Sequence, residues 1–149
     1  LGRVVYMWRD RGLPYNTIVD KVVSIAKTYK PSVFLCETNG IGDPVYEAIK
    51  KQYSRVEPFI TTNTSKENMV RRLIGDMEDN ALELPSPTLF PALYHELQSY
   101  QYEMLPSGKV RYSHPSGLHD DAVDSLMLSN WARTAKSHSR KKMVISSIR

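Results

Sequence analysis

The chain has 149 residues, of which 41% are hydrophobic and 24% are charged, a composition typical of one globular domain. Its single cysteine, Cys36, excludes an internal disulfide framework and fits a reducing cytosol. No apolar run approaches the roughly 20 residues of a membrane-spanning helix, and the N-terminus lacks a signal-peptide pattern. Because the chain begins with Leu1 and not with Met, we expect it to be part of a longer protein.

The net charge of +4 is unevenly distributed along the chain. Residues 133–149 contain six basic residues and no acidic one, whereas residues 1–132 contain 14 basic and 16 acidic residues. We therefore predict one domain at residues 1–132, followed by a basic C-terminal tail at residues 133–149. Contact with phosphate or with an acidic surface is one possible role for such a tail. A solvated, disordered end is the default expectation.

The first part of the chain alternates strand patterns with helix patterns. The β-rich residues 4–8 predict a first strand. Apolar residues at helical spacing predict a helix after Asn16, its expected N-cap. Residues 32–36 form a continuous apolar run, which is typical of a strand buried on both faces. A loop at residues 39–42, which contains two glycines, leads into a second helix.

Strand and helix patterns continue in the second part of the chain. Residues 56–61 predict a strand in which Pro58 favours an edge position. A capping box that starts at Thr64 predicts the next helix. The remaining predicted elements are a short strand at residues 81–85, an amphipathic helix at 88–100, a hairpin of 100–104 with 109–112, and a last helix after Asp120. This order predicts an α/β domain with a partly parallel sheet of about four strands, a hairpin and four or five helices.

Three carboxylates gather at the start of the last predicted helix. Asp120, Asp121 and Asp124 lie directly before or within an apolar run that extends to residue 132. Acidic side chains at a helix N-terminus are stabilised by the helix dipole, so a purely structural cap is one interpretation. The other interpretation is a site for a divalent cation, because clustered carboxylates repel one another unless a cation neutralises them.

Glu37 follows the most apolar predicted strand, at the strand end where functional groups gather in open α/β sheets. A carboxylate there is costly to desolvate unless it is paired or binds metal, although a solvated strand end is an alternative. Oxygen ligands without a Cys or His cluster favour Mg²⁺ or Mn²⁺ over zinc. Two such ions about 3.5–4 Å apart are a common arrangement for phosphodiester hydrolysis. Glu37, Asp120 and Asp121 are therefore candidate catalytic and metal-binding residues.

The order of these motifs resembles the C-terminal nuclease domain of the large terminase subunit of tailed phages and prophages, the DNA-packaging motor. The resemblance is carried by Glu37 with the loop at 38–42, the helix start at Ser65-Lys66-Glu67, the turn and strand at 80–85, and residues 119–126. It covers residues 2 to about 132. The phosphate-binding motif G-x-x-x-x-G-K-[ST], expected in the ATPase domain of that subunit, does not occur in the chain.

The resemblance implies an RNase H-like mixed sheet flanked by helices, and a metal-dependent endonuclease that cleaves double-stranded DNA with two Mg²⁺ or Mn²⁺ ions. By position, Glu37 matches the second acid of the family, and the last acid is either Asp120 or Asp121. The family's first catalytic Asp would lie upstream of Leu1. We therefore expect a truncated sheet without its first strands, weak metal binding and poor cleavage. The implied partners are the portal protein and the small terminase subunit, in the host cytoplasm and without a membrane.

Other polar residues are candidates for supporting roles. His119 is a candidate for water activation or metal binding, and Asp124 for a group beside the metal ligands. The candidate DNA-binding residues are Lys66, Arg71, Arg72, Lys109 and Arg111. Basic residues of this kind make contacts with DNA phosphates that do not depend on the base sequence. A solvated helix face and ordinary hairpin packing are the structural alternatives.

Two other functions fit the same sequence. One is another RNase H-like nuclease, of the resolvase or transposase type. The other is a non-catalytic module that docks DNA or a portal-type partner through the basic tail, with the acidic residues in structural roles. Cleavage of DNA by the parent protein, and its loss when Glu37 or Asp121 is replaced, would separate the nuclease from the docking module.

Overall fold

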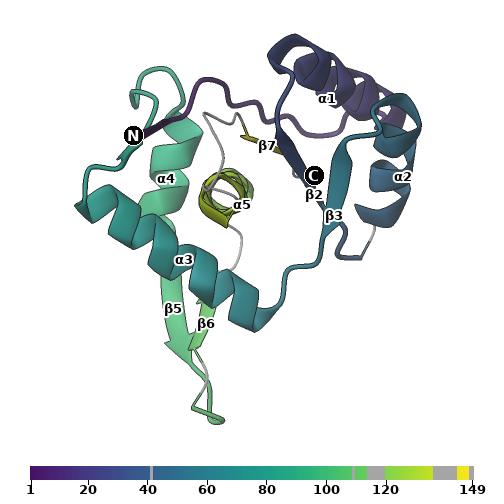
Figure 1. Cartoon of the computed structure of the whole chain (residues 1–149). Coiled ribbons are helices and arrows are strands. Elements are labelled where there is room, and N and C mark those ends of the chain that lie inside the picture. The colour runs from purple at the N-terminus through teal and green to yellow at the C-terminus, as the bar shows by residue number, and fades with distance from the viewer. Residues whose placement is uncertain (41, 109, 114–119, 136–143, 148–149) are drawn as a thin grey trace.

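The computed structural model describes residues 1–40, 42–108, 110–113, 120–135 and 144–147 (Figure 1). The helices are α1 (Tyr15–Tyr29), α2 (Gly42–Gln52), α3 (Asn63–Glu78), α4 (Pro91–Ser99) and α5 (Asp121–Ala135). The strands are β1 (Gly2–Arg3), β2 (Val33–Glu37), β3 (Val56–Phe59), β4 (Leu82–Glu83), β5 (Gln101–Met104), β6 (Val110–Ser113) and β7 (Val144–Ser147). In this part of the chain, no helix combines the length and the apolarity needed to cross a bilayer.

The strands of the described residues form three small sheets. β2 lies between β3 and β7 and is parallel to both. β1 pairs with β4, also in parallel, and β5 with β6 forms an antiparallel hairpin that projects from the body of the molecule (Figure 1). The predicted α/β class, the hairpin and the edge position of the Pro58 strand are confirmed, while the parallel strands are divided between two separate sheets.

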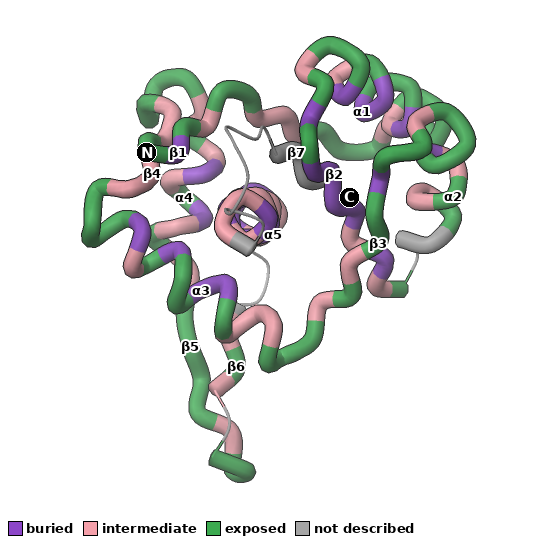
Figure 2. Tube along the Cα trace, in the orientation of Figure 1, coloured by how far each residue is buried: buried purple, intermediate pink, exposed green. Residues whose placement is uncertain are grey.

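β2 is the element against which both halves of the core pack. Its side chains alternate between two faces, as the period of a strand requires. Val33 and Leu35 belong to a cluster with α3, α4 and α5, whereas Phe34 and Cys36 belong to a cluster with α1 and α2. All four residues are buried, as Figure 2 shows in purple. The prediction of a strand buried on both faces is therefore confirmed.

α5 runs through the middle of the molecule and is seen end-on in Figure 1. It contacts α3, α4, β2 and β7. Its apolar residues Val123, Leu126 and Met127 are buried, which agrees with the apolar run in the sequence. The start of α5 carries the acidic residues, so burial of this helix determines where their carboxylates lie.

Three local predictions are wrong. Residues 4–8 form no strand, because only β1 pairs with β4, and the chain then continues as an irregular segment whose Val4 and Trp8 pack on different core clusters. Asn16 is not the N-cap of α1, which is Pro14. The capping box of α3 is formed by Thr62 and Ser65, two residues earlier than the sequence pattern indicated.

The tail at residues 133–149 is not wholly a disordered end. α5 continues to Ala135, and β7 pairs with β2 in the register Val33 with Val144. An apolar, β-branched sequence can thus follow a basic one and still complete a sheet edge. Residues 136–143, which hold four of the six basic residues of the tail, lie outside the described residues.

Replacement of Leu93 with alanine tests the packing of α4 on the core. Leu93 is fully buried in the cluster that contains β2 and α5. We expect Leu93→Ala to lower the free energy of unfolding by about 2–5 kcal/mol, measured by urea denaturation. Leu89→Ala is the control, because Leu89 is 78% exposed and its loss should change stability by about 0.5 kcal/mol or less. Equal effects of the two changes would contradict the assigned core.

Candidate active site

Two of the predicted acidic residues converge on one lysine. The Lys66 Nζ donates hydrogen bonds to Asp120 Oδ2 at 3.3 Å and to Asp124 Oδ2 at 3.0 Å. Lys66 lies in the first turn of α3, whereas both aspartates lie at the start of α5. Asp120 and Asp124 are four residues apart and therefore share one face of the helix. The contact joins α3 to α5 through three partly buried, charged side chains.

The charges of Lys66, Asp120 and Asp124 shift the pKa values of Lys66 and Asp124. Burial lowers the pKa of Lys66, but the nearby charges and hydrogen bonds of Asp124 and Asp120 outweigh that effect and raise it. Burial raises the pKa of Asp124 to about 6, and the charges of Asp120 and Glu37 add to this rise, whereas Lys66 opposes it. Asp124 Oδ1 is buried and has no hydrogen-bond partner within the described part of the chain. The cluster therefore holds a buried carboxylate oxygen that accepts no hydrogen bond from the described residues.

Glu37 lies at the carboxyl end of β2, as predicted, and is partly buried. The chain after it is fixed to the end of β3. Thr38 N donates to Phe59 O at 2.9 Å, and the Asn39 side chain both donates to and accepts from the backbone of Thr61. The charge of Glu37 acts on Asp124, so Glu37 belongs to the same electrostatic environment as the acids of α5.

Asp121 faces a different cation. Its Oδ2 lies 3.2 Å from an amino group of Arg9, and the other amino group of Arg9 lies 2.7 Å from Glu96 Oε1. Glu96 Oε2 accepts hydrogen bonds from the backbone nitrogens of Ala122 at 2.7 Å and of Val123 at 3.1 Å. Glu96 therefore caps α5 from another helix. Asp120 and Asp121 are adjacent in sequence, but they lie against different basic side chains.

Three residues of this environment were not predicted from the sequence: Arg9, Glu96 and Tyr100. Tyr100 lies at the end of α4, where its ring is 5.8 Å from the Lys66 Nζ. Its hydroxyl is buried without a described hydrogen-bond partner, and burial, with the charges of Asp124 and Asp120, raises the pKa of the phenol. A signal existed for Glu96, because it is three residues after Leu93, on the apolar stripe of its helix.

The predicted DNA-binding residues are mostly paired with acidic side chains of the protein. Arg71 bonds Glu67 at 2.7 Å, and Arg72 bonds the buried Asp76 at 3.0 Å. Arg111 is exposed on β6, opposite Glu103 of β5 in the hairpin register. Two further candidates, Lys109 and His119, lie outside the described residues.

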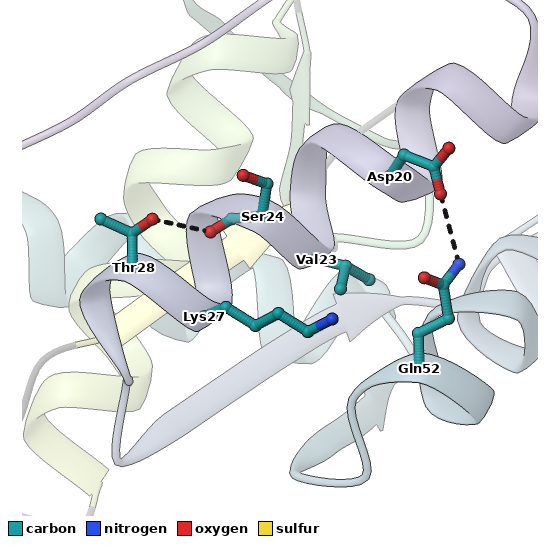
Figure 3. Close-up of a pocket in the computed structure, with 6 residues that line it drawn as sticks. All are labelled: Asp20, Val23, Ser24, Lys27, Thr28 and Gln52. Atoms are coloured by element: carbon teal, nitrogen blue, oxygen red, sulfur yellow. Dashed lines mark hydrogen bonds between the residues drawn. The ribbon is translucent and has the colours of Figure 1, made fainter.

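A separate surface depression lies between α1 and α2. Figure 3 shows its lining residues, which are Asp20, Val23, Ser24, Lys27, Thr28 and Gln52. Gln52 donates a 3.4 Å hydrogen bond to Asp20 across it. None of the predicted site residues lines this depression, so it is separate from the acidic cluster.

The donor set at the acidic cluster fits a hard divalent cation in its chemistry. Carboxylate oxygens are the preferred ligands of Mg²⁺, and Asp124 Oδ1 has no other partner in the described residues. However, within those residues no three His, Cys, Asp or Glu side chains are grouped closely enough to hold a metal ion. The ammonium of Lys66 contacts the carboxylates of both Asp120 and Asp124.

Comparison with known proteins identifies the family of the chain. Residues 2–130 match the family model described as the terminase RNaseH-like domain. The chain belongs to this family. The large terminase subunits of Thermus virus P23-45 and Thermus phage G20c are each 25% identical to it over 130 residues, which is 86% of the chain and 26% of each relative. The chain thus spans about a quarter of the length of these terminase subunits.

Solved structures of terminase nucleases share its fold. The large terminase nuclease of thermophilic phage G20c is 23% identical, with a TM-score of 0.68, and the match covers 83% of this chain and 63% of that one. The same nuclease with bound magnesium is 24% identical, with a TM-score of 0.67 and coverage of 80% and 62%. The nuclease domain of Thermus phage P74-26 is 20% identical, with a TM-score of 0.67 and coverage of 87% and 65%. The predicted terminase resemblance and the RNase H-like fold are confirmed.

Replacement of Glu96 with alanine tests the cap of α5 in this terminase domain. Glu96→Ala removes two hydrogen bonds to the helix and leaves the charge of Arg9 without its buried partner. We expect a loss of about 3–5 kcal/mol in the free energy of unfolding. Glu96→Gln retains an oxygen acceptor for the helix and should cost less.

The control for Glu96 is an exposed ion pair of the same length. Arg3 and Glu83 are also 2.7 Å apart, but the Glu83 side chain is 48% exposed, whereas that of Glu96 is 6% exposed. Glu83→Ala should therefore cost about 1 kcal/mol or less in urea denaturation. A Glu96→Ala protein as stable as the Glu83→Ala protein would show that Glu96 does not cap α5.

Burial of Asp124 makes the stability of the domain depend on pH. The pKa of Asp124 is raised to about 6 in the folded chain, above its value of about 3.8 when unfolded. The folded state therefore binds more protons between these pH values, and this group reduces stability as the pH rises through that window.

Asp124→Asn removes this unfavourable ionisation. The variant should be more stable than the parent by up to about 3 kcal/mol at pH 7, and the difference should disappear near pH 4. Urea denaturation of both proteins at the two pH values measures the effect. The prediction fails if the stability difference is the same at pH 4 as at pH 7.

Proposed function

We propose that this chain is part of the nuclease of a phage terminase large subunit, and that it hydrolyses phosphodiester bonds of double-stranded DNA during genome packaging. Three observations support the proposal: membership of the terminase RNase H-like family, the fold shared with terminase nucleases, and the acidic cluster at the start of α5. The observation that carries it is the convergence of Asp120 and Asp124 on the ammonium of Lys66. The charge of Glu37 also acts on Asp124.

The residues that would hold divalent metal are Glu37, Asp120 and Asp121, with Asp124 beside them. If these residues bound two Mg²⁺ or Mn²⁺ ions, the site would gain water activation and neutralisation of charge on the scissile phosphate. Carboxylates on a helix start and on a strand end are held by the backbone of two buried elements, which fixes their relative positions. The unpartnered Asp124 Oδ1 supports a place for this residue among the oxygen ligands.

Basic residues around the cluster are proposed to position the DNA backbone. Arg71 is exposed on α3 and is paired with Glu67 by an i to i+4 contact that water can readily replace. Arg111 lies on the hairpin, which projects next to α3. Contacts with phosphates from these two elements would hold duplex DNA near the acids of α5 without reading its sequence.

The biological setting is also a proposal. By family, the partners of the complete subunit are double-stranded DNA, the portal protein and the small terminase subunit, and the place of action is the cytoplasm of the host. A non-catalytic docking module is the second candidate function. It is favoured by one observation: the described residues contain no preformed group of three potential metal ligands.

Cleavage of plasmid DNA separates these two functions. The protein translated from its complete reading frame should nick and linearise supercoiled plasmid with Mn²⁺, and EDTA should abolish the reaction. We expect Glu37→Ala and Asp120→Ala to reduce the rate by a factor on the order of 100 or more, because each removes a ligand charge at the reacting phosphate. Asp121→Ala tests whether the residue held by Arg9 is also required.

Asp20→Ala is the matched control for the cleavage experiment, because Asp20 lies in the separate depression between α1 and α2. It removes the same side chain and should retain the parent rate. A parent protein that leaves the plasmid intact, or acidic-site variants that cut as fast as Asp20→Ala, would exclude the nuclease function.

A further inference from the structure

The environment of Lys66 is that of a bound cation and not of a surface lysine. Its ammonium contacts Asp120 on one side and Asp124 on the other, and the ring of Tyr100 lies 5.8 Å away. The Lys66 side chain is only 19% exposed. An aromatic face and two carboxylates are the groups that stabilise a desolvated ammonium. The site therefore surrounds the end of this side chain with favourable partners.

The position of Lys66 in its own helix is locally unfavourable. The capping box of Thr62 and Ser65 begins α3, and Lys66 follows directly in the first turn. A positive charge near a helix N-terminus opposes the helix dipole, whose positive end lies there. The acids of α5 are therefore the compensating interaction. Their contact with Lys66 joins residues that are far apart in the sequence. It forms because α3 and α5 pack side by side.

We propose that Lys66 is a built-in counter-cation of the acidic site, which holds Asp120 and Asp124 together until divalent metal displaces it. The inference rests on the proposed metal site. Two carboxylates without a cation would repel each other, and Lys66 removes that repulsion. A divalent ion bound to the same oxygens would repel the ammonium, which must then leave. The four-carbon stem of lysine permits this movement, and the freed ammonium could contact a DNA phosphate.

The proposal makes opposite predictions for stability and for metal affinity. Without metal, Lys66→Met removes the ammonium that contacts both carboxylates, so the 149-residue chain should melt at a lower temperature in EDTA. With metal, the variant lacks the competing cation, so Mn²⁺ should bind more tightly, on the order of tenfold, in titration calorimetry. The increase in melting temperature on addition of Mn²⁺ should likewise be larger than for the parent. If Lys66 had only a structural role, its replacement would lower both the stability and the metal affinity of the protein.

Two controls accompany the measurement. Lys27→Met removes the same charge from an exposed position on α1, and should leave both the melting temperature and the affinity close to those of the parent. Lys66→Gln removes the charge but retains a hydrogen-bond donor. It should bind Mn²⁺ more tightly than the parent even if Lys66→Met does not fold.

The outcomes separate this inference from the proposed function. If the parent and the Lys66 variants bind Mn²⁺ equally, or the variants bind it more weakly, the counter-cation role is overturned while the metal site stands. If the parent and every variant fail to bind Mn²⁺ at millimolar concentrations, the proposed metal site fails, and the exchange with it. Tighter binding by both Lys66 variants, with Lys27→Met unchanged, would establish the exchange.

Discussion

The arrangement of charged residues around α5 depends on one requirement: the first backbone N–H groups of this buried helix need hydrogen-bond acceptors. α5 lies in the middle of the molecule, so its first backbone N–H groups cannot rely on water. The carboxylate of Glu96 accepts from two of them, and a carboxylate that is itself buried needs a cation. Arg9 supplies that cation from the irregular segment after β1. One helix end thus brings together residues from the beginning, the middle and the end of the chain.

The same helix end sorts the acidic residues between two cations. Asp121 lies on the side of Arg9, whereas Asp120 and Asp124 lie on the side of Lys66. Arg9 contacts both Asp121 and Glu96, and Glu96 caps α5, so Asp121 belongs to the same group of contacts as the helix cap. Asp120 and Asp124 both contact Lys66, whose long side chain can move. Adjacent residues at this helix end therefore contact different parts of the chain: Asp121 contacts the segment before α1, and Asp120 contacts α3.

Local patterns predicted most of the elements, and long-range pairing explains the rest. Residues 32–36 and the last helix were predictable because their continuous apolar runs are buried. The hairpin is exposed on β5 and was predictable from the turn residues between its strands. Residues 4–8 carried a strand pattern but lie beyond the short ladder of β1 with β4. Val4, Met7 and Trp8 pack on the core clusters, whereas Val5 and Tyr6 are exposed. Glu37 and the acids of α5 were predictable from their positions at element ends. Arg9 and Glu96 are 87 residues apart in sequence, and no local pattern connects them.

The pairing of β7 with β2 has a consequence for how the chain folds during synthesis. Val33 pairs with Val144, 111 residues later, so one edge of the most buried strand stays open until nearly all of this sequence has left the ribosome. Contacts of such high sequence separation form slowly. Meanwhile, the open edge of an apolar strand is a template for pairing with other chains. The late arrival of β7 would therefore make chaperone protection most valuable for nascent chains that stall before residue 144.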